Sequence, residues 1–172
     1  MIQFTDWLSR TSVSLAIQTH EWVIPTVQSI HIVAIGVVLG SVLMIVLRVL
    51  GRAGRDQSLM ETTGRFSPWL FSALCVMLAT GTLMVIGEPA RELLAFSFWL
   101  KMFLVLVATV IAGIFEASLH KNESHWENSI AKSTRTKSVA IFTLLIWIAI
   151  VILGRLIAYD HVWGSWSHAP KA

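Results

Sequence analysis

Residues 22–48 read WVIPTVQSIHIVAIGVVLGSVLMIVLR, and this stretch decides the fold class. Before the arginine at its end, only Gln28 and His31 interrupt it as strongly polar side chains. About 20 apolar residues in helical conformation are enough to cross the hydrocarbon core of a bilayer. The stretch therefore predicts a membrane-spanning helix over about residues 22–48.

Three further apolar stretches lie at about residues 67–86, 96–115 and 139–158. The four stretches take up roughly half of a 172-residue chain that is 55% apolar and only 13% charged. Ordinary soluble domains are about 45 to 50% apolar and about 25% charged. The sequence predicts an all-α, polytopic membrane protein, with residues 1–172 forming a single membrane domain built as a four-helix bundle. It leaves no room for a large soluble catalytic domain.

The segment before the first span, residues 1–21, holds acidic and polar residues where a signal peptide would have a basic start and a short apolar core. We expect this segment to be retained. Its apolar side chains are compatible with a short N-terminal helix that lies along the membrane interface. These side chains are Phe4, Trp7, Leu8, Leu15 and Ile17.

The basic residues predict the orientation. They gather around the first and third connections: Arg48, Arg52, Arg55, Arg65, Lys121, Lys132, Arg135 and Lys137. The second connection carries only Arg91, against Glu88 and Glu92. Cytoplasmic loops are enriched in Lys and Arg, so both termini are expected outside. The formal net charge of +3 comes from scattered residues, and we expect no nucleic-acid partner.

Gly36 and Gly40 form a G-x-x-x-G motif in the first span, which lets two helix backbones approach closely. We expect this face to pack against a neighbouring helix, or to provide an oligomer contact. His31 precedes the two glycines by five and nine residues, so it points about 140° to 180° away from them at 100° per residue. One face of the helix would then pack while the other presents the imidazole.

Ionisable side chains inside a span are costly in hydrocarbon and usually face the bundle interior, which makes them the main functional candidates. His31, Lys101 and Arg155 all fall in the outer halves of their spans, and Gln28 lies one turn before His31. Lys101 and Arg155 are near enough to the interface for their charged ends to reach it. For His31 two interpretations are open: a neutral imidazole hydrogen-bonded to another helix, or a ligand or proton carrier.

Familiar soluble chemistry has no support in the sequence. It contains no zinc-type Cys/His spacing, no nucleotide-binding loop and no hydrolase elbow. The single cysteine, Cys75, lies in an apolar run and excludes a disulfide framework within one chain. His120 and His125 are expected to cap a helix at the inner end or to meet solvent, and Trp147, in mid-span, is expected to pack between helices.

Three motifs carry a resemblance to a known kind of protein. They are PTVQSIHIVAIGVVLGSVLMIVLRVLG at 25–51, FWLKMFLVL at 98–106 and GRLIAYD at 154–160. This pattern resembles an uncharacterised family of small bacterial four-helix membrane proteins with a first-helix His and an LRxLG ending. One departure lies directly before the Leu-Arg pair of that ending, where the pattern has an acidic residue and this chain has an apolar one. The resemblance implies location in the bacterial inner membrane.

More distantly, the chain resembles the four-helix membrane proteins of the copper-resistance D type and the oxygen-independent membrane protoporphyrinogen oxidase. The shared features are the first-helix His31 and Lys101 after an aromatic residue. The latter family binds b-type haem, so the resemblance implies a haem or porphyrin site. His31 would ligate the haem iron, and Lys101 and Arg155 would hold the propionates. The other spans offer no second histidine at similar depth, which leaves Met102 and Met84 as candidate thioether ligands.

These observations lead to three competing functions. The first is b-type haem or quinone-linked electron transfer, with the chain as a membrane oxidoreductase or its cytochrome-like subunit and with a redox protein as partner. The second is a non-catalytic membrane anchor or assembly subunit that acts through contacts with other membrane proteins. The third is a metal or small-solute transporter. A conduction path needs polar residues at several depths, and the inner half of the bundle offers mainly Thr, Ser and Gly.

Overall fold

The computed structural model describes residues 1–157, except for the side chains of residues 128–132. The end of the predicted fourth span at residue 158 and the whole outer tail lie outside the described residues. The described part contains helices and no strands, as predicted. Its helices are α1 (Ile2–Ser9), α2 (Ser12–Thr19), α3 (Val23–Val49), α4 (Leu59–Gly87), α5 (Pro89–Leu93), α6 (Phe96–Lys121), α7 (Glu123–Lys132) and α8 (Thr134–Leu156).

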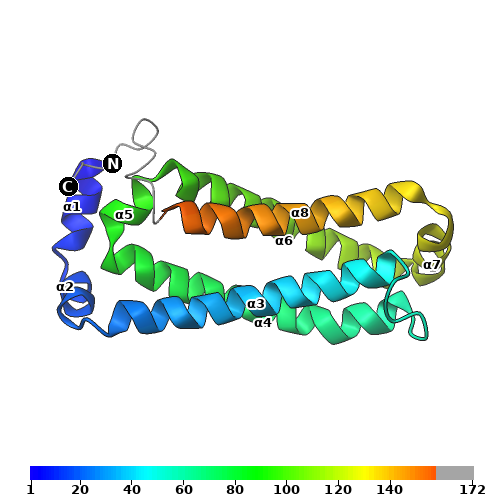
Figure 1. Ribbon diagram of the computed structural model, residues 1–172. Helices are drawn as coiled ribbons and strands as arrows, with labels where there is room; N and C mark the ends of the chain where they lie inside the picture. The colour runs from blue at the N-terminus through cyan, green and yellow to red at the C-terminus, as the bar shows by residue number, and fades with distance from the viewer. Residues whose placement is uncertain (158–172) are drawn as a thin grey trace.

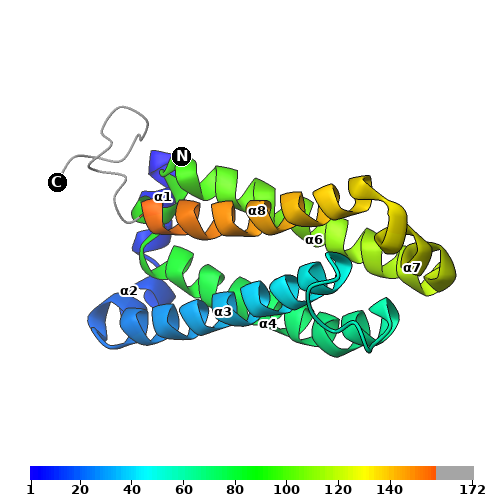
Figure 2. The same cartoon turned by 45° about the vertical axis from the view of Figure 1, so that its right-hand side comes forward.

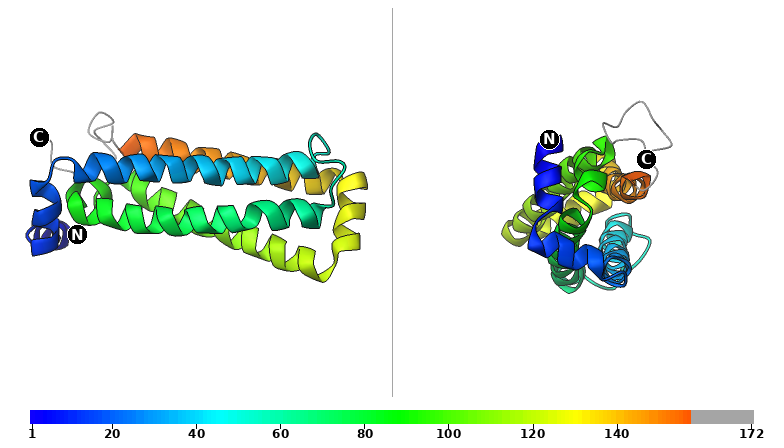
Figure 3. Two further views of the ribbon diagram at one scale, coloured as in Figure 1. Left: turned by 90° about the horizontal axis from the view of Figure 1, so that it is seen from below. Right: turned by 90° about the vertical axis from the view of Figure 1, so that its left-hand side faces the viewer.

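Four long helices, α3, α4, α6 and α8, run side by side and form the bundle (Figures 1 and 2). Each is long and apolar enough to cross a membrane. The short helices α1 and α2 lie across one end of the bundle, next to α5, and α7 crosses the other end (Figure 3). We call these the α5 end and the α7 end. The predicted four-helix bundle is confirmed, and two short helices stand where the sequence predicted a single one before the first span. Their position along a membrane interface stays a prediction.

The pair is attached to the bundle by polar contacts. The Ser14 hydroxyl donates to the carbonyl oxygen of Ile86 at 2.6 Å, and Gln18 Nε2 donates to that of Gly87 at 3.1 Å. These carbonyls belong to the last turn of α4, which has no intrahelical donors left for them. Phe4 and Trp7 on α1 remain exposed. Aromatic side chains in this position suit the boundary between hydrocarbon and water.

His20 and His31 lie on different helices, because α3 begins only after His20. Pro25 is the third residue of α3, where its missing N–H costs nothing because the first turn of a helix has no intrahelical acceptors for its donors. His20 is the C-cap residue of α2 instead, and its Nδ1 lies 2.8 Å from the carbonyl oxygen of Ala16. The two histidines therefore lie on different helices.

The helices continue beyond the predicted apolar spans. α4 begins at Leu59, about two turns before residue 67, because Ser58 and Glu61 form a reciprocal capping box there. Pro68 is tolerated inside α4 at the loss of one backbone hydrogen bond. At the α7 end, the stretch 116–138 contains the last turns of α6, all of α7 and the start of α8. The connection between the third and fourth predicted spans is therefore helical for most of its length.

The core follows the centre of the bundle. Val38 on α3, Ala73 on α4, Ala108 on α6 and Trp147 on α8 belong to one buried cluster. Trp147 is only 2% exposed, which confirms the prediction that it packs between helices. Its indole N–H has no hydrogen-bond partner among the described residues.

The glycine motif does not pack within the chain. Gly36 and Gly40 are exposed, and a Cβ atom built on either would meet nothing within 4 Å. The buried stripe of α3 includes Ala34 and Val38, and residues two apart on a helix point about 200° away from each other. The predicted packing against a neighbouring helix was therefore wrong. A contact with a second copy through this face stays a prediction.

Candidate ligand cavity of the helix bundle

A cavity of about 210 Å³ lies near the α5 end, and we call it the α5-end cavity. Side chains of α3, α4, α5, α6 and α8 line it, and most of them are apolar. Among its polar and thioether lining residues are five that the sequence had singled out: Gln28, His31, Met84, Lys101 and Arg155. The fold thus brings side chains from four separate spans to one internal space.

His31 is held by a helix-to-helix hydrogen bond. Its Nδ1 lies 2.7 Å from Oγ1 of Thr80 on α4. The Thr80 hydroxyl donates its one hydrogen to the carbonyl oxygen of Val76 at 2.7 Å, so we assign the hydrogen of the first contact to Nδ1 of His31. Nε2 then carries a lone pair. The bond matches the first of the two interpretations of His31, and the assigned tautomer leaves Nε2 as an acceptor or ligand atom.

Lys101 lines the same cavity from α6. Its ammonium lies 5.5 Å from the centre of the Phe98 ring, and its stem passes Gly154 on α8, where a Cβ atom would lie 3.6 Å from Lys101 Cδ. Among the described residues it makes neither a hydrogen bond nor an ion pair, although the Glu92 carboxylate acts on it electrostatically. The ammonium is therefore available to a ligand in the cavity.

Glu92 on α5 adds a carboxyl group to this cavity. The residue is 8% exposed. Burial raises the pKa of its carboxyl above the ordinary value, while the positive charges of Lys101 and Arg91 oppose that shift and Glu88 adds to it. The cavity therefore holds an acid whose proton is released at a higher pH than usual, near a cation and an imidazole.

The remaining predicted site residues differ in position. Gln28 and Arg155 are exposed side chains that line the cavity, and Gln28 makes no hydrogen bond to a described residue. Met84 also lines the cavity and is partly buried. Met102 is 39% exposed on the outer surface of α6 and does not line the cavity. Met84, and not Met102, therefore lines the same cavity as His31.

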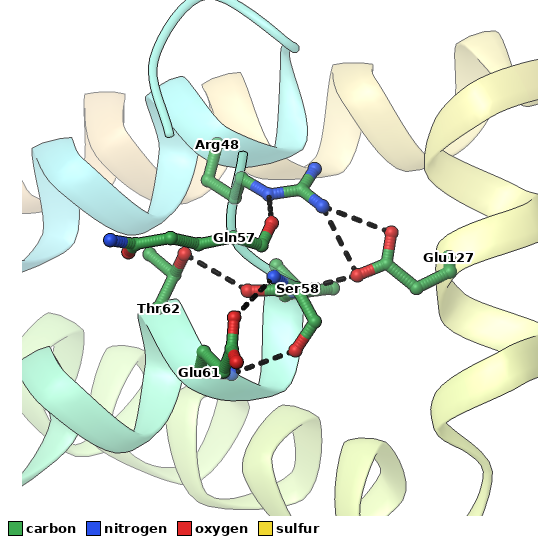
Figure 4. Close-up of polar contacts among 7 residues, drawn as sticks. Arg48, Gln57, Ser58, Glu61, Thr62 and Glu127 are labelled. Atoms are coloured by element: carbon green, nitrogen blue, oxygen red, sulfur yellow. Dashed lines mark hydrogen bonds and ion pairs between the residues drawn. The ribbon is translucent and has the colours of Figure 1, made fainter. Parts of the chain in front are cut away.

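A second polar cluster lies at the α7 end (Figure 4). Nη2 of Arg48 donates to both carboxylate oxygens of Glu127 at 3.0 and 3.1 Å, and Nε of Arg48 donates to the carbonyl oxygen of Gln57 at 2.8 Å. The backbone N–H of Leu59 also donates to Glu127. One carboxylate on α7 therefore joins the end of α3 to the start of α4.

Sequence reasoning missed Thr80, Glu92 and Glu127. In the sequence, Glu92 stands out only as a charge opposite Arg91. A signal for Glu92 existed, because it lies nine residues before Lys101 in the connection that leads into the same span. The pairing of Arg48 with Glu127, 79 residues apart, leaves no local pattern.

These features define an integral membrane protein: a bundle of four helices able to span a bilayer, with a cavity between the helices that is lined by the buried Glu92 and the partly buried His31 and Lys101. The chain belongs to a family of unknown function, DUF6644, whose model matches residues 4–160. This agrees with the predicted membership of an uncharacterised family. No curated protein and no solved structure matches the chain.

Proposed function

We propose that this protein takes part in quinone-linked electron transfer in the bacterial inner membrane and that the α5-end cavity binds the head group of a membrane quinone. The observation that carries the proposal is the convergence of His31, Lys101 and Glu92 on a mainly apolar cavity inside a membrane bundle. A quinone head is an apolar ring with two carbonyl oxygens. Such a ligand needs an apolar wall and a few placed polar groups, which is the composition typical of small-molecule sites.

The polar groups suit both oxidation states of the ring. The Lys101 ammonium can donate to a quinone carbonyl oxygen, and Nε2 of His31 can accept from a quinol hydroxyl. The largely buried Trp147 ring adds an apolar surface to the wall of the same cavity. Reduction of a quinone takes up two electrons and two protons. The redox partner protein exchanges the electrons, and His31 and Glu92 are the groups suited to exchange the protons.

The size of the cavity favours a single ring. Pockets for drug-sized ligands are about 300 to 1,000 Å³, and this cavity is about 210 Å³. A haem macrocycle is much larger than a quinone ring, so the cavity does not accommodate it without movement of the helices. A b-type haem is nevertheless the second candidate, because the hydrogen bond from Nδ1 of His31 orients the ring as metal-bound imidazoles are usually oriented.

We also propose an orientation of the bundle in the membrane. The α7 end carries most of the basic residues and would face the cytoplasm, and the α5 end would face outward. Protons released from a quinol in the α5-end cavity would then leave on the outer side.

Binding of a short-tailed quinone, such as ubiquinone-1, to the purified protein tests the proposal. We expect saturable binding that His31→Ala and Lys101→Met each weaken at least tenfold. Met102→Leu on the outer surface of α6 is the matched control and should bind as the wild type does. Absence of saturable binding, or equal binding by the wild type and all three variants, would refute the proposed quinone site.

An absorption spectrum of the same preparations separates the two candidates. A full equivalent of haem, lost in His31→Ala, would replace the quinone proposal with the haem proposal. A colourless protein that also binds no quinone would favour the membrane anchor.

A further inference from the structure

A second cavity, of about 280 Å³, lies toward the α7 end of the bundle, and we call it the α7-end cavity. Side chains of α3, α4, α6, α7 and α8 line it, and nearly all are apolar. Phe115 and Trp126 contribute their rings, which meet edge to face at 5.2 Å between centroids. The proposed quinone site makes no use of this space.

The polar residues of the α7-end cavity are arranged by depth. Arg135 and Thr136 line it from the first turn of α8, at the end of the bundle, and Trp147 lines it near the middle of α8. Between them α8 contributes Val139, Ala140 and Thr143. The Thr143 hydroxyl donates its hydrogen to the carbonyl oxygen of Val139. The cavity therefore has a polar mouth and an apolar interior.

Two arginines of the α7 end differ in what they contact. Arg48 is buried and has its counter-charge within the chain, on Glu127. Arg135 is exposed, lines the mouth of the cavity and makes no ion pair with a described residue. A guanidinium at the end of a membrane span, without a carboxylate partner in the described part of the chain, is complementary to a phosphate.

The separation of two lining residues on α8 matches the depth of one leaflet. Arg135 and Trp147 are twelve residues apart on α8, which is about 18 Å at 1.5 Å per residue. The hydrocarbon core of a bilayer is about 30 Å thick, so one leaflet contributes about 15 Å. A chain that begins at the depth of Arg135 would end near Trp147.

We propose that the α7-end cavity is a binding site for an anionic phospholipid, with one acyl chain in the apolar interior and the phosphate on Arg135. The cytoplasmic leaflet supplies such lipids if the α7 end faces the cytoplasm. This site is independent of the quinone proposal, because it shares only Trp147 with the α5-end cavity.

Native mass spectrometry of the full chain in detergent tests this site, with phosphatidylglycerol and phosphatidylcholine of identical acyl chains as probes. We expect the wild type to prefer phosphatidylglycerol by about fivefold, the contribution of one basic residue near an anionic lipid surface. Arg135→Gln should abolish the preference. Arg65→Gln changes the same charge at the exposed start of α4, outside the cavity, and should keep it.

Filling the cavity tests the acyl chain. Ala112 on α6 lines the cavity. Ala112→Leu should weaken the binding of both lipids by about tenfold, because the leucine side chain displaces about two methylene groups of the acyl chain from the cavity. Ala117→Leu, on the exposed face of the same helix, should bind both lipids as the wild type does.

Three results would overturn the proposal. The first is equal affinity of the wild type for the two lipids. The second is an equal loss of the preference for phosphatidylglycerol in Arg65→Gln and Arg135→Gln. The third is displacement of phosphatidylglycerol by a long-tailed quinone at the same concentration. Because Arg135 is an exposed residue, Arg135→Gln decides the question even if Ala112→Leu fails to fold.

Discussion

The contact between Arg48 and Glu127 gives a stability prediction that can be worked out from the structure. The Arg48 side chain is 11% exposed and that of Glu127 is 33% exposed, so the pair is neither fully buried nor on the surface. Removing one partner of a buried pair costs about 3 to 5 kcal/mol, whereas exposed pairs contribute about 0 to 1 kcal/mol. For Glu127→Ala we expect a loss of about 2 to 3 kcal/mol, part of which comes from the Leu59 N–H that the carboxylate also accepts.

A double-mutant cycle isolates the pair itself. Arg48→Met keeps an apolar stem and removes the guanidinium, so the double variant should lose at least about 1 kcal/mol less than the sum of the two single losses. The control cycle uses Arg91 and Glu88, whose side chains are 43% and 39% exposed and whose coupling should stay below about 1 kcal/mol.

Hydrogen exchange of the α7 amides is the assay, because Glu127 joins α7 to the rest of the α7 end. In Glu127→Ala these amides should exchange faster, while those at the centre of α3 should change little. Strictly additive losses, or unchanged exchange in α7, would refute the view that this carboxylate holds α7 in place.

The remaining predictions concern single residues. A Cβ atom at Gly87 would lie 2.6 Å from Cδ1 of Ile24, so Gly87→Ala should lower the melting temperature in detergent, whereas Gly36→Ala, with nothing within 4 Å, should leave it unchanged or raise it. Thr80→Val removes the acceptor of the interhelical bond and should cost about 0.6 kcal/mol, with a maximum near 1.7, in detergent unfolding; a neutral effect would argue against that bond. Burial raises the pKa of the Glu92 carboxyl in the folded state, so its contribution to stability is present below its ordinary pKa of 4.5 and is lost as pH rises through the raised value. As the pH rises from about 4.5 through the raised pKa, the melting temperature of the wild type should therefore fall relative to that of Glu92→Gln. Melting temperatures of the two proteins that change in parallel with pH would contradict the raised pKa.

Much of the fold was predictable because the hydrocarbon core imposes a simple requirement of length and polarity. That requirement determines the four spans and places His31, Lys101 and Arg155 in one half of the bundle. Helix ends were less predictable, since α6 and α8 continue into polar sequence where no rule of hydropathy applies. The start of α4 was within reach, because Ser58 and Glu61 show the spacing of a capping box.

The face of each helix was the harder problem. Gly36 and Gly40 form a recognised packing motif, yet the buried stripe of α3 contains Ala34 and Val38 instead. The spacing of two glycines indicates where another helix backbone can approach closely, whereas the partner helix determines which face is buried. The partner of His31 on α4 and the position of Met102 outside the cavity depend on that same choice of face, which a single sequence does not determine.

Photolabelling with an azido-quinone, followed by peptide mapping, tests the quinone site most directly. A quinone in the α5-end cavity should label the segments that line it, chiefly residues 24–39 and 147–157, and these labels should disappear when unlabelled ubiquinone-1 is added in excess. Labels confined to the outer surface of α6 around Met102 and Phe103, and unaffected by competitor, would contradict it.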